Sequence, residues 1–171
     1  MYTIKEATVN DAEIIHQLAH EIWPSTYSPI LADDQIEYML ADRYTVETLS
    51  HQINKGEQTY LIVMDDGLPV AFAGFSVDVV NPDIYRLHKL YSLPATQGKG
   101  VGKMLLNAIY ERVLAAGKNI LELNVHRLNP AKGFYEKMGF KKTHQRKKFY
   151  SDGENAWVME LKTSDLSPVI Q

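Results

Sequence analysis

The feature that most constrains this chain is a glycine-rich corner at residues 97–103, Gln-Gly-Lys-Gly-Val-Gly-Lys. Before the corner, Leu and Tyr residues predict a buried strand, and Pro94 ends that strand because proline cannot donate to a β-ladder. Unpaired N–H groups and the dipole of a helix N-terminus attract phosphate oxygens, so a helix after the corner would make it a phosphate site. The residues that predict the strand are Leu87, Leu90, Tyr91 and Leu93, and those that recur at helical spacing are Val101, Met104, Leu105, Ala108, Ile109 and Val113.

Two common phosphate-binding motifs do not fit this corner. The magnesium-nucleotide P-loop needs glycine and Ser or Thr at the positions that Gln97 and Met104 occupy. The dinucleotide fingerprint needs glycine or alanine at the position of Lys103 or of Leu105, depending on its register. A glycine corner can also be purely structural, so the glycines alone do not establish a ligand.

Two blocks of this sequence resemble one known family. The string Gln97-x-x-Gly100-x-Gly102 resembles the coenzyme A pyrophosphate loop of the GNAT acetyltransferase superfamily, Gln/Arg-x-x-Gly-x-Gly/Ala. Residues 124–140, which include Asn129 and the run Phe-Tyr-Glu-Lys-Met-Gly-Phe, resemble the block that follows this loop in the superfamily. The resemblance implies one α/β domain over residues 1–171, with a mixed, mainly antiparallel sheet of about seven strands flanked by helices.

The remaining elements follow from apolar periodicity and turn residues. Asn10 and Asp11 offer the cap of a first helix, which Pro24 and Pro29 are expected to interrupt, and Asp33 or Asp34 is expected to cap a second helix. The other predicted elements are strand 2–7, helix 46–53, a hairpin of 59–64 and 69–79, strand 119–125, helix 129–138, a final hairpin of 141–149 and 156–161 around 151–154, and a mobile tail at 163–171.

Composition excludes several other classes. The 171 residues contain no cysteine, which excludes a disulfide framework, a thiolate metal site and a cysteine acyl-enzyme. The net charge of −3 argues against non-specific nucleic-acid binding and permits a cationic acceptor. No long apolar run or basic leader is visible, so we expect no membrane partner and a cytoplasmic location. His16 and His20 are more typical of a solvated helix face than of a metal site, because the zincin pattern needs Glu where Gln17 stands.

The resemblance also implies how the coenzyme, acetyl-CoA with CoA as its product, is held without a metal. Backbone amides of the corner would bind the pyrophosphate, with charge from Lys99 or Lys103. Main-chain groups before the corner would take the pantetheine arm, one N–H would face the thioester oxygen, and Asn129 matches a position that bonds this arm. The predicted coenzyme set is Leu90, Tyr91, Ser92, Leu93, Gln97, Gly98, Lys99, Gly100, Val101, Gly102, Lys103, Asn129, Lys132 and Tyr135.

Direct transfer to an amine needs a general acid and a way to remove the amine's proton. Tyr135 matches the family's general acid, a phenol near the coenzyme sulfur; from residues alone, a core tyrosine is the alternative. His88 stands where many relatives carry a Glu base, although a histidine in a strand is also typical of a satisfied core residue. His126 is a comparable base, and Glu21 and Glu122 are weaker alternatives. Some relatives use water instead.

The residues that bind the acceptor, and the acceptor itself, are the part of the site that the sequence predicts least. Trp23 and Tyr27 would either line the acceptor pocket, together with His126, or pack the helical layer. A partial likeness of this region to spermidine/spermine acetyltransferases favours a small primary amine such as a polyamine. An amino acid, an antibiotic amine, a protein N-terminus or a lysine stays open, as does a CoA-binding regulatory domain without turnover. A homodimer through the final hairpin is expected only by analogy.

Overall fold

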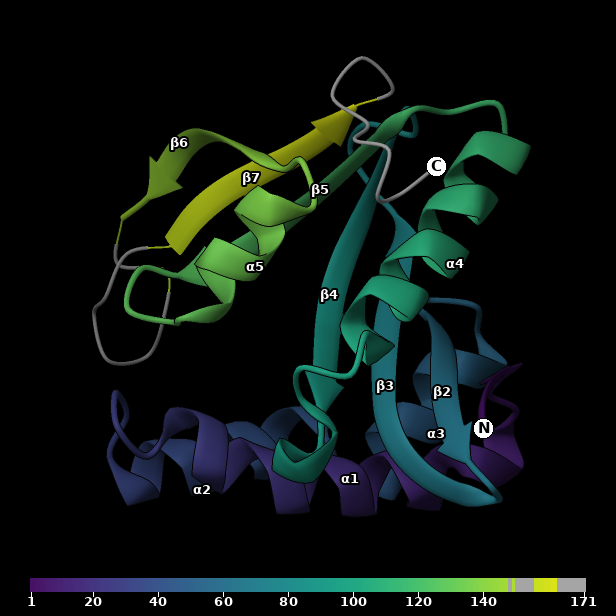
Figure 1. Ribbon diagram of the computed structural model, residues 1–171, viewed down its shortest axis with the longest axis vertical. Helices are drawn as coiled ribbons and strands as arrows, with labels where there is room; N and C mark the ends of the chain where they lie inside the picture. Colours follow the sequence, from purple (N-terminus) through teal and green to yellow (C-terminus); the bar gives the residue numbers. More distant parts are fainter. Residues whose placement is uncertain (148, 150–155, 163–171) are drawn as a thin grey trace. The chain divides into compact units, whose positions relative to one another are not determined.

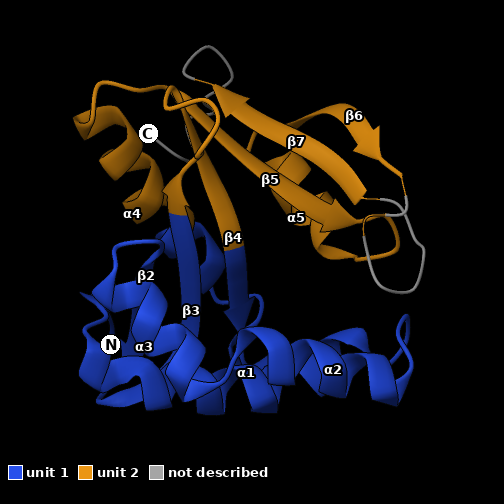
Figure 2. Ribbon diagram, turned by 180° about the vertical axis from the view of Figure 1, so that it is seen from behind, with its two compact units in different colours: residues 1–75, 89–105 blue, residues 76–88, 106–171 orange. Residues whose placement is uncertain are grey.

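The protein is described from a computed structural model that covers residues 1–147, 149 and 156–162. The chain divides into two compact units (Figure 2). Unit 1 consists of residues 1–75 and 89–105, and unit 2 of residues 76–88 and 106–171. The prediction of one domain over 1–171 stays a prediction.

The secondary structure is mixed (Figure 1). The helices are α1 (Ala12–Tyr27), α2 (Asp33–Arg43), α3 (Val46–Asn54), α4 (Val101–Ala115) and α5 (Ala131–Lys137), with short 3-10 turns η1 (Val9–Asp11) and η2 (Pro94–Thr96). The strands are β1 (Tyr2–Glu6), β2 (Thr59–Asp65), β3 (Leu68–Val77), β4 (Ile84–Ser92), β5 (Ile120–His126), β6 (Lys141–Arg146) and β7 (Ala156–Lys162).

The strands form a seven-stranded sheet in the order β1-β2-β3-β4-β5-β7-β6. The pairs β1–β2, β2–β3, β5–β7 and β6–β7 are antiparallel. The pair β4–β5 is parallel and spans Ile84–Leu87 against Ile120–Leu123. The predicted fold class, a mixed α/β protein with a mainly antiparallel sheet of about seven strands, is therefore confirmed.

Helix α1 corrects one prediction. Pro24 does not interrupt the helix, which continues to Tyr27, and the Ser28 N–H donates to the Pro24 carbonyl at 3.0 Å. Proline has a φ close to the helical value, and although it loses the bond from its own N–H and crowds the preceding turn, Pro24 lies in the last turn, where this affects only the end of the helix. The Ser25 hydroxyl donates to the Ile22 carbonyl at 2.9 Å beside it. The helix therefore carries both Trp23 and Tyr27 on one continuous backbone.

The predicted acidic caps are only partly correct. Asp11 does stand at the N-cap of α1, but its carboxylate accepts from the Thr8 N–H at 2.8 Å and from Lys5 Nζ at 2.9 Å instead of capping the helix. Asp33 and Asp34 lie in the first turn of α2, where the helix dipole favours negative charge, and the cap itself is Ala32. The sequence therefore predicts the N-cap position of α1 correctly but not a side-chain cap bond there, and its prediction of an acidic cap for α2 is wrong.

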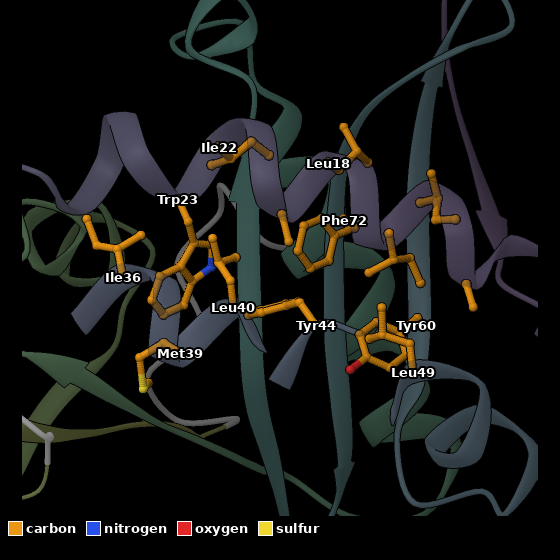
Figure 3. Close-up of a cluster of buried hydrophobic side chains, with 14 of the residues drawn as sticks. Leu18, Ile22, Trp23, Ile36, Met39, Leu40, Tyr44, Leu49, Tyr60 and Phe72 are labelled. Atoms are coloured by element: carbon orange, nitrogen blue, oxygen red, sulfur yellow. The ribbon is translucent and has the colours of Figure 1, made fainter. Parts of the chain in front are cut away.

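Unit 1 is built around an aromatic and aliphatic core (Figure 3). Ile15, Leu18, Ala19 and Ile22 of α1 are buried at the spacing expected for one helix face. Their partners come from the next two helices and from the strands: Ile36, Met39, Leu40, Tyr44, Leu49, Tyr60, Ile62 and Phe72. The predicted hairpin of residues 59–64 and 69–79 is confirmed as β2 and β3, joined at Asp66 and Gly67 with positive φ values of 49° and 87°.

Unit 2 contains the late strands and α5. The predicted final hairpin is confirmed as the antiparallel pair β6–β7, whereas its turn at 151–154 and the tail at 163–171 lie outside the described residues. The helix predicted for 129–138 is shorter, Ala131–Lys137, and follows an Asn129 side chain that accepts from the Ala131 N–H at 2.9 Å. β6 is last in the strand order, and its exposed residues include Lys141, Lys142 and Arg146.

Within the residues that the structure describes, the longest and most apolar helices fall short of what a membrane crossing requires.

Candidate active site

The glycine corner of unit 1 places two glycines of positive φ directly before the start of α4. Gly98 and Gly100 have φ values of +80° and +82°, a region that favours glycine. A Cβ at either position would meet no atom within 4 Å, so backbone conformation and not lack of space requires these glycines. The first bond into α4 runs from the Met104 N–H to the Gly100 carbonyl at 3.0 Å. The preceding N–H groups of 101–103 therefore have no acceptor inside the helix and are available for an anion.

The strand before the corner is not uniformly buried, which corrects the sequence prediction. Leu87 and Lys89 are buried, His88 between them is exposed, and Leu90 to Leu93 are half-buried. Successive side chains of a strand point to opposite faces of the sheet, so His88 is exposed on one face while Leu87 and Lys89 are buried on the other. The Leu93 N–H donates to the Val70 carbonyl at 2.9 Å and is not available to a ligand. Alternation then directs the Ser92 and Leu90 backbone groups toward the opposite edge.

Trp23 and Tyr27 both lie inside the unit 1 core. They are 4 % and 8 % exposed, and their rings lie 4.4 Å apart between centroids. The hydroxyls of Tyr27 and Tyr91 are hydrogen-bonded at 2.8 Å, which ties the end of α1 to the strand predicted to hold pantetheine. The packing role is thus established for both residues, and an additional role in binding the acceptor stays a prediction.

Lys89 is the residue of unit 1 that sequence reasoning missed. It is 7 % exposed, its ammonium donates to the Tyr60 hydroxyl, and it lies 4.9 Å from the ring centroids of Tyr44 and Tyr60. Burial, and to a lesser degree the charge of Arg43, lowers the pKa of Lys89 to about 7. The sequence does carry a signal for the burial of Lys89. It lies two residues from both Leu87 and Tyr91, so in a strand all three side chains share one face.

In unit 2, Tyr135 and Asn129 are both buried, at 7 % and 8 % exposure. The Tyr135 ring lies 5.4 Å from that of Phe134 and 5.5 Å from that of Phe140, in edge-to-face arrangements. This ring packing fixes the direction of the phenol on α5, as a positioned general acid requires.

The two histidines proposed as bases have different environments. His88 is exposed, and its Nε2 shares a hydrogen bond of 2.7 Å with the Ser76 hydroxyl. His126 is only 1 % exposed, and its Nδ1 accepts from the Leu128 N–H at 3.1 Å. Because an accepting Nδ1 carries no proton, a neutral His126 has its hydrogen on Nε2. Of the two histidines, His88 is therefore the more accessible to an acceptor amine.

Glu122 belongs to a charge network that sequence reasoning also missed. It is 5 % exposed and pairs with Arg86 at 2.8 Å and with Arg146 at 3.7 Å. Arg86 also contacts the Asp78 carboxylate at 3.0 Å. Two guanidinium groups already pair with the buried Glu122 carboxylate, so an acceptor amine could reach it only by displacing an arginine. This argues against Glu122 as the general base.

Lys132 shares one aromatic surface with a second lysine. The Lys132 and Lys142 Nζ atoms lie 5.9 and 4.4 Å from the centroid of the Trp157 ring. A hydrogen bond with Lys142, followed by burial and by the repulsion of its charge, lowers the pKa of Lys132. Two ammonium groups this close favour an anion beside them, consistent with the predicted role of Lys132 toward the phosphorylated coenzyme.

His16 and His20 each contact a backbone carbonyl through one ring nitrogen. Their Nδ1 atoms contact the carbonyls of Tyr44 at 2.6 Å and of His16 at 2.8 Å. In the described part of the chain, no three potential His, Cys, Asp or Glu ligands gather into one group.

The family model described as "Acetyltransferase (GNAT) domain" matches residues 27–163. The chain therefore belongs to the GNAT acetyltransferase family and is an N-acetyltransferase in class.

The chain is similar to named enzymes and to solved structures over half or more of its length. The spermidine N(1)-acetyltransferase of Thermoplasma acidophilum is 29% identical over 145 residues, 81% of this chain and 87% of the relative. The [ribosomal protein bS18]-alanine N-acetyltransferase of Haemophilus influenzae is 38% identical over 90 residues, 50% of this chain and 62% of the relative. The PaiA N-acetyltransferase of Thermoplasma acidophilum, solved in complex with coenzyme A, has a TM-score of 0.82 at 25% identity and covers 95% of this chain and 99% of its own.

Proposed function

We propose that this protein transfers an acetyl group directly from acetyl-CoA to the primary amine of a small cationic molecule such as a polyamine. The observation that carries the proposal is the corner at 97–103, whose two positive-φ glycines leave the N–H groups of the first turn of α4 unbonded. The coenzyme supplies the activated acetyl group as a thioester. A similar structure, PaiA, contains coenzyme A, which supports this assignment.

In this proposal the residues of unit 1 act mainly through their backbone. N–H groups of 101–103 bind the pyrophosphate, and the exposed Lys99 and Lys103 add positive charge. The main chain of Leu90 and Ser92 bonds the pantetheine arm, because the Leu93 N–H is already taken by Val70. One of these two N–H groups stabilises the oxyanion that forms when the amine attacks the thioester carbon.

The residues of unit 2 act through their side chains. Tyr135 donates its phenol proton to the thiolate that leaves when the tetrahedral intermediate breaks down. Asn129 bonds the pantetheine arm, and Lys132 with Lys142 attracts a phosphate of the coenzyme. His88 accepts the amine's proton, a role that its exposure and its bond to Ser76 support.

The charge of the N-terminal helical region supports a cationic acceptor. Residues 1–57 contain ten Asp and Glu against three Lys and Arg, although the whole chain has a net charge of only −3. The acidic side chains on the helices are exposed: Glu13, Glu21, Asp33, Asp34, Glu37, Asp42 and Glu47. Such a surface raises the local concentration of a polycation. The named activity of the Thermoplasma spermidine acetyltransferase points to the same class of acceptor.

A protein N-terminus is the second candidate acceptor. It is favoured by the 38% identity over 90 residues to an enzyme named for acetylating an alanine of ribosomal protein bS18. Both acceptors present a primary amine, so the site chemistry above is the same for each.

The test is a thiol-release assay with acetyl-CoA and a panel of amines that includes spermidine, single amino acids, aminoglycosides and peptides with N-terminal alanine. The chain has no cysteine, so new thiol comes from the coenzyme. We expect release with polyamines. If thiol is released only with the peptides, the acceptor is a protein N-terminus and not a polyamine. If no amine in the panel releases thiol while the protein still binds CoA, the proposed acetyl transfer is wrong and a CoA-binding domain without turnover is the better interpretation.

A further inference from the structure

Lys89 is a buried cation whose neighbours are phenols and an amide. Its ammonium donates to the Tyr60 hydroxyl, which itself donates to the Gln52 Oε1 at 2.6 Å. Burial raises the pKa of Tyr60 well above its ordinary value, so Tyr60 remains a neutral phenol. The hydrogen-bonded chain thus runs from β4 through β2 to α3, and Lys89 gains no counter-charge from its partner in it.

Each element packed around Lys89 contributes an identifiable group. The C-terminal end of α2 contributes two groups: the ring of its cap residue Tyr44, 4.9 Å from the Lys89 Nζ, and the guanidinium of its last residue Arg43, which disfavours the charged lysine. Burial also raises the pKa of Tyr44, so that this phenol stays neutral. From α1, His16 reaches the Tyr44 carbonyl, and Tyr27 bonds Tyr91 of β4. Histidine is the side chain that ordinarily changes charge near neutral pH, so a variant at His16 is the necessary control.

Lys89 directly precedes the coenzyme strand Leu90–Ser92. The Lys89 side chain is held by Tyr60 of β2 and by Tyr44 at the end of α2, and this restrains the backbone of β4 next to it. The cation lies at equal distance from two aromatic rings, an arrangement that is attractive only while the lysine is charged. When the proton leaves, both ring interactions are lost and the hydrogen bond to Tyr60 weakens.

We propose that Lys89 is a positioning residue for the coenzyme strand: its protonated side chain, held by Tyr60 and Tyr44, keeps the backbone of Leu90–Ser92 in the coenzyme-binding arrangement. Loss of the Lys89 proton releases this restraint and weakens CoA binding. The inference rests on the proposed function, because it assumes that Leu90–Ser92 bind the coenzyme. By reciprocity, bound CoA should favour the protonated lysine.

The first experiment follows the backbone amides of Leu90–Ser92 by NMR in the coenzyme-free protein between pH 5.5 and 9. In the wild type we expect their chemical shifts to move together with one midpoint near neutral pH. Lys89→Met, which keeps the length of the side chain without a charge, should remove this transition. His16→Gln should retain it. Loss of the transition in His16→Gln with retention in Lys89→Met would overturn the proposal.

The second experiment measures CoA affinity by calorimetry at pH 6.5 and 8.5. The affinity of the wild type should fall with rising pH by about fivefold more than that of Lys89→Met, since ionisation of CoA itself is common to both proteins. Tyr60→Phe, which keeps the ring and removes the acceptor, should move the amide midpoint to lower pH. Equal pH dependence in wild type and Lys89→Met, with CoA bound by both, overturns this inference alone. No CoA binding by the wild type overturns the proposed function.

Discussion

The two units of this protein bury charge in opposite ways. Unit 2 places the Glu122 carboxylate between the guanidinium groups of Arg86 and Arg146, at 2.8 and 3.7 Å. Unit 1 buries Lys89 against a neutral phenol and two aromatic rings. The Glu122 carboxylate has opposite charges beside it, whereas Lys89 has none among the described residues, and its burial lowers the pKa of Lys89 to about 7. Stability is expected to depend on the first arrangement and pH response on the second.

The units also differ in which atoms they offer to chemistry. In unit 1 the proposed coenzyme residues would act through N–H groups, so glycine geometry at Gly98 and Gly100 should matter more than side-chain identity. In unit 2 the proposed roles of Tyr135, Asn129 and His88 depend on side-chain atoms. Substitutions in unit 1 should therefore change coenzyme affinity, and those in unit 2 should change turnover.

The largest effect is expected from breaking the charge network of unit 2. Arg86→Met leaves Glu122 buried with only the more distant Arg146, which should lower the free energy of unfolding by about 3 kcal/mol. Urea denaturation at pH 7 measures this as a fall in midpoint. Lys118→Met, which removes an exposed pair with Asp83, is the matched control and should change stability by less than about 0.5 kcal/mol. Equal losses in both variants would show that burial does not distinguish these pairs.

The next effect tests side-chain chemistry in unit 2. Tyr135→Phe should lower kcat by about 100-fold because the leaving thiolate loses its acid. Affinity for CoA should change little, and both are measured by steady-state thiol release and calorimetry. Tyr38→Phe, the same change at a tyrosine that is 62 % exposed on α2, should leave kcat unaltered. Undiminished turnover in Tyr135→Phe would contradict the proposed acid.

Lys89 should give unit 1 a stability that rises with pH. Its pKa is about 7 in the folded protein against an ordinary value of 10.5, so the unfolded chain binds more protons between these values. The burial cost is fully present below pH 7 and is relieved as pH rises toward 10.5. Relative to Lys89→Met, the wild type should gain about 2 kcal/mol between pH 7 and 9, as measured by urea midpoints. Parallel pH curves would contradict this difference between the units.

The smallest effect concerns backbone geometry. Gly100→Ala forces a Cβ into a positive φ and should cost about 1 kcal/mol or distort the corner, with a matching loss of CoA affinity. Gly133→Ala within α5 is the control, because a Cβ there meets no atom within 4 Å and φ is not positive. It should be neutral or stabilise the protein by up to about 1 kcal/mol. Calorimetry and urea denaturation on both variants separate affinity from stability.

Sequence reasoning succeeded where one local signal dominates. Apolar periodicity and turn glycines predicted the elements, and the motif at Gln97–Gly102 predicted the family. It failed where the outcome depends on distant partners: Pro24 within α1, the burial of Lys89, and the pairing of Arg86 with Glu122. A lysine in a strand is ordinarily predicted to be exposed. Its burial can be predicted only when the positions of the surrounding aromatic residues, here Tyr44 and Tyr60, are known.

The exposed lysines of β6 have a consequence for self-association. An edge strand offers unpaired backbone groups to which another strand can add, and charged side chains along it discourage such addition. Lys141, Lys142 and Arg146 would be brought against their own copies if two chains joined at this edge. Like charges directly opposite one another are destabilising across an antiparallel pair. Charge repulsion would therefore oppose a dimer built through the last strand of this sheet, and raising the ionic strength would weaken that opposition by screening the charges.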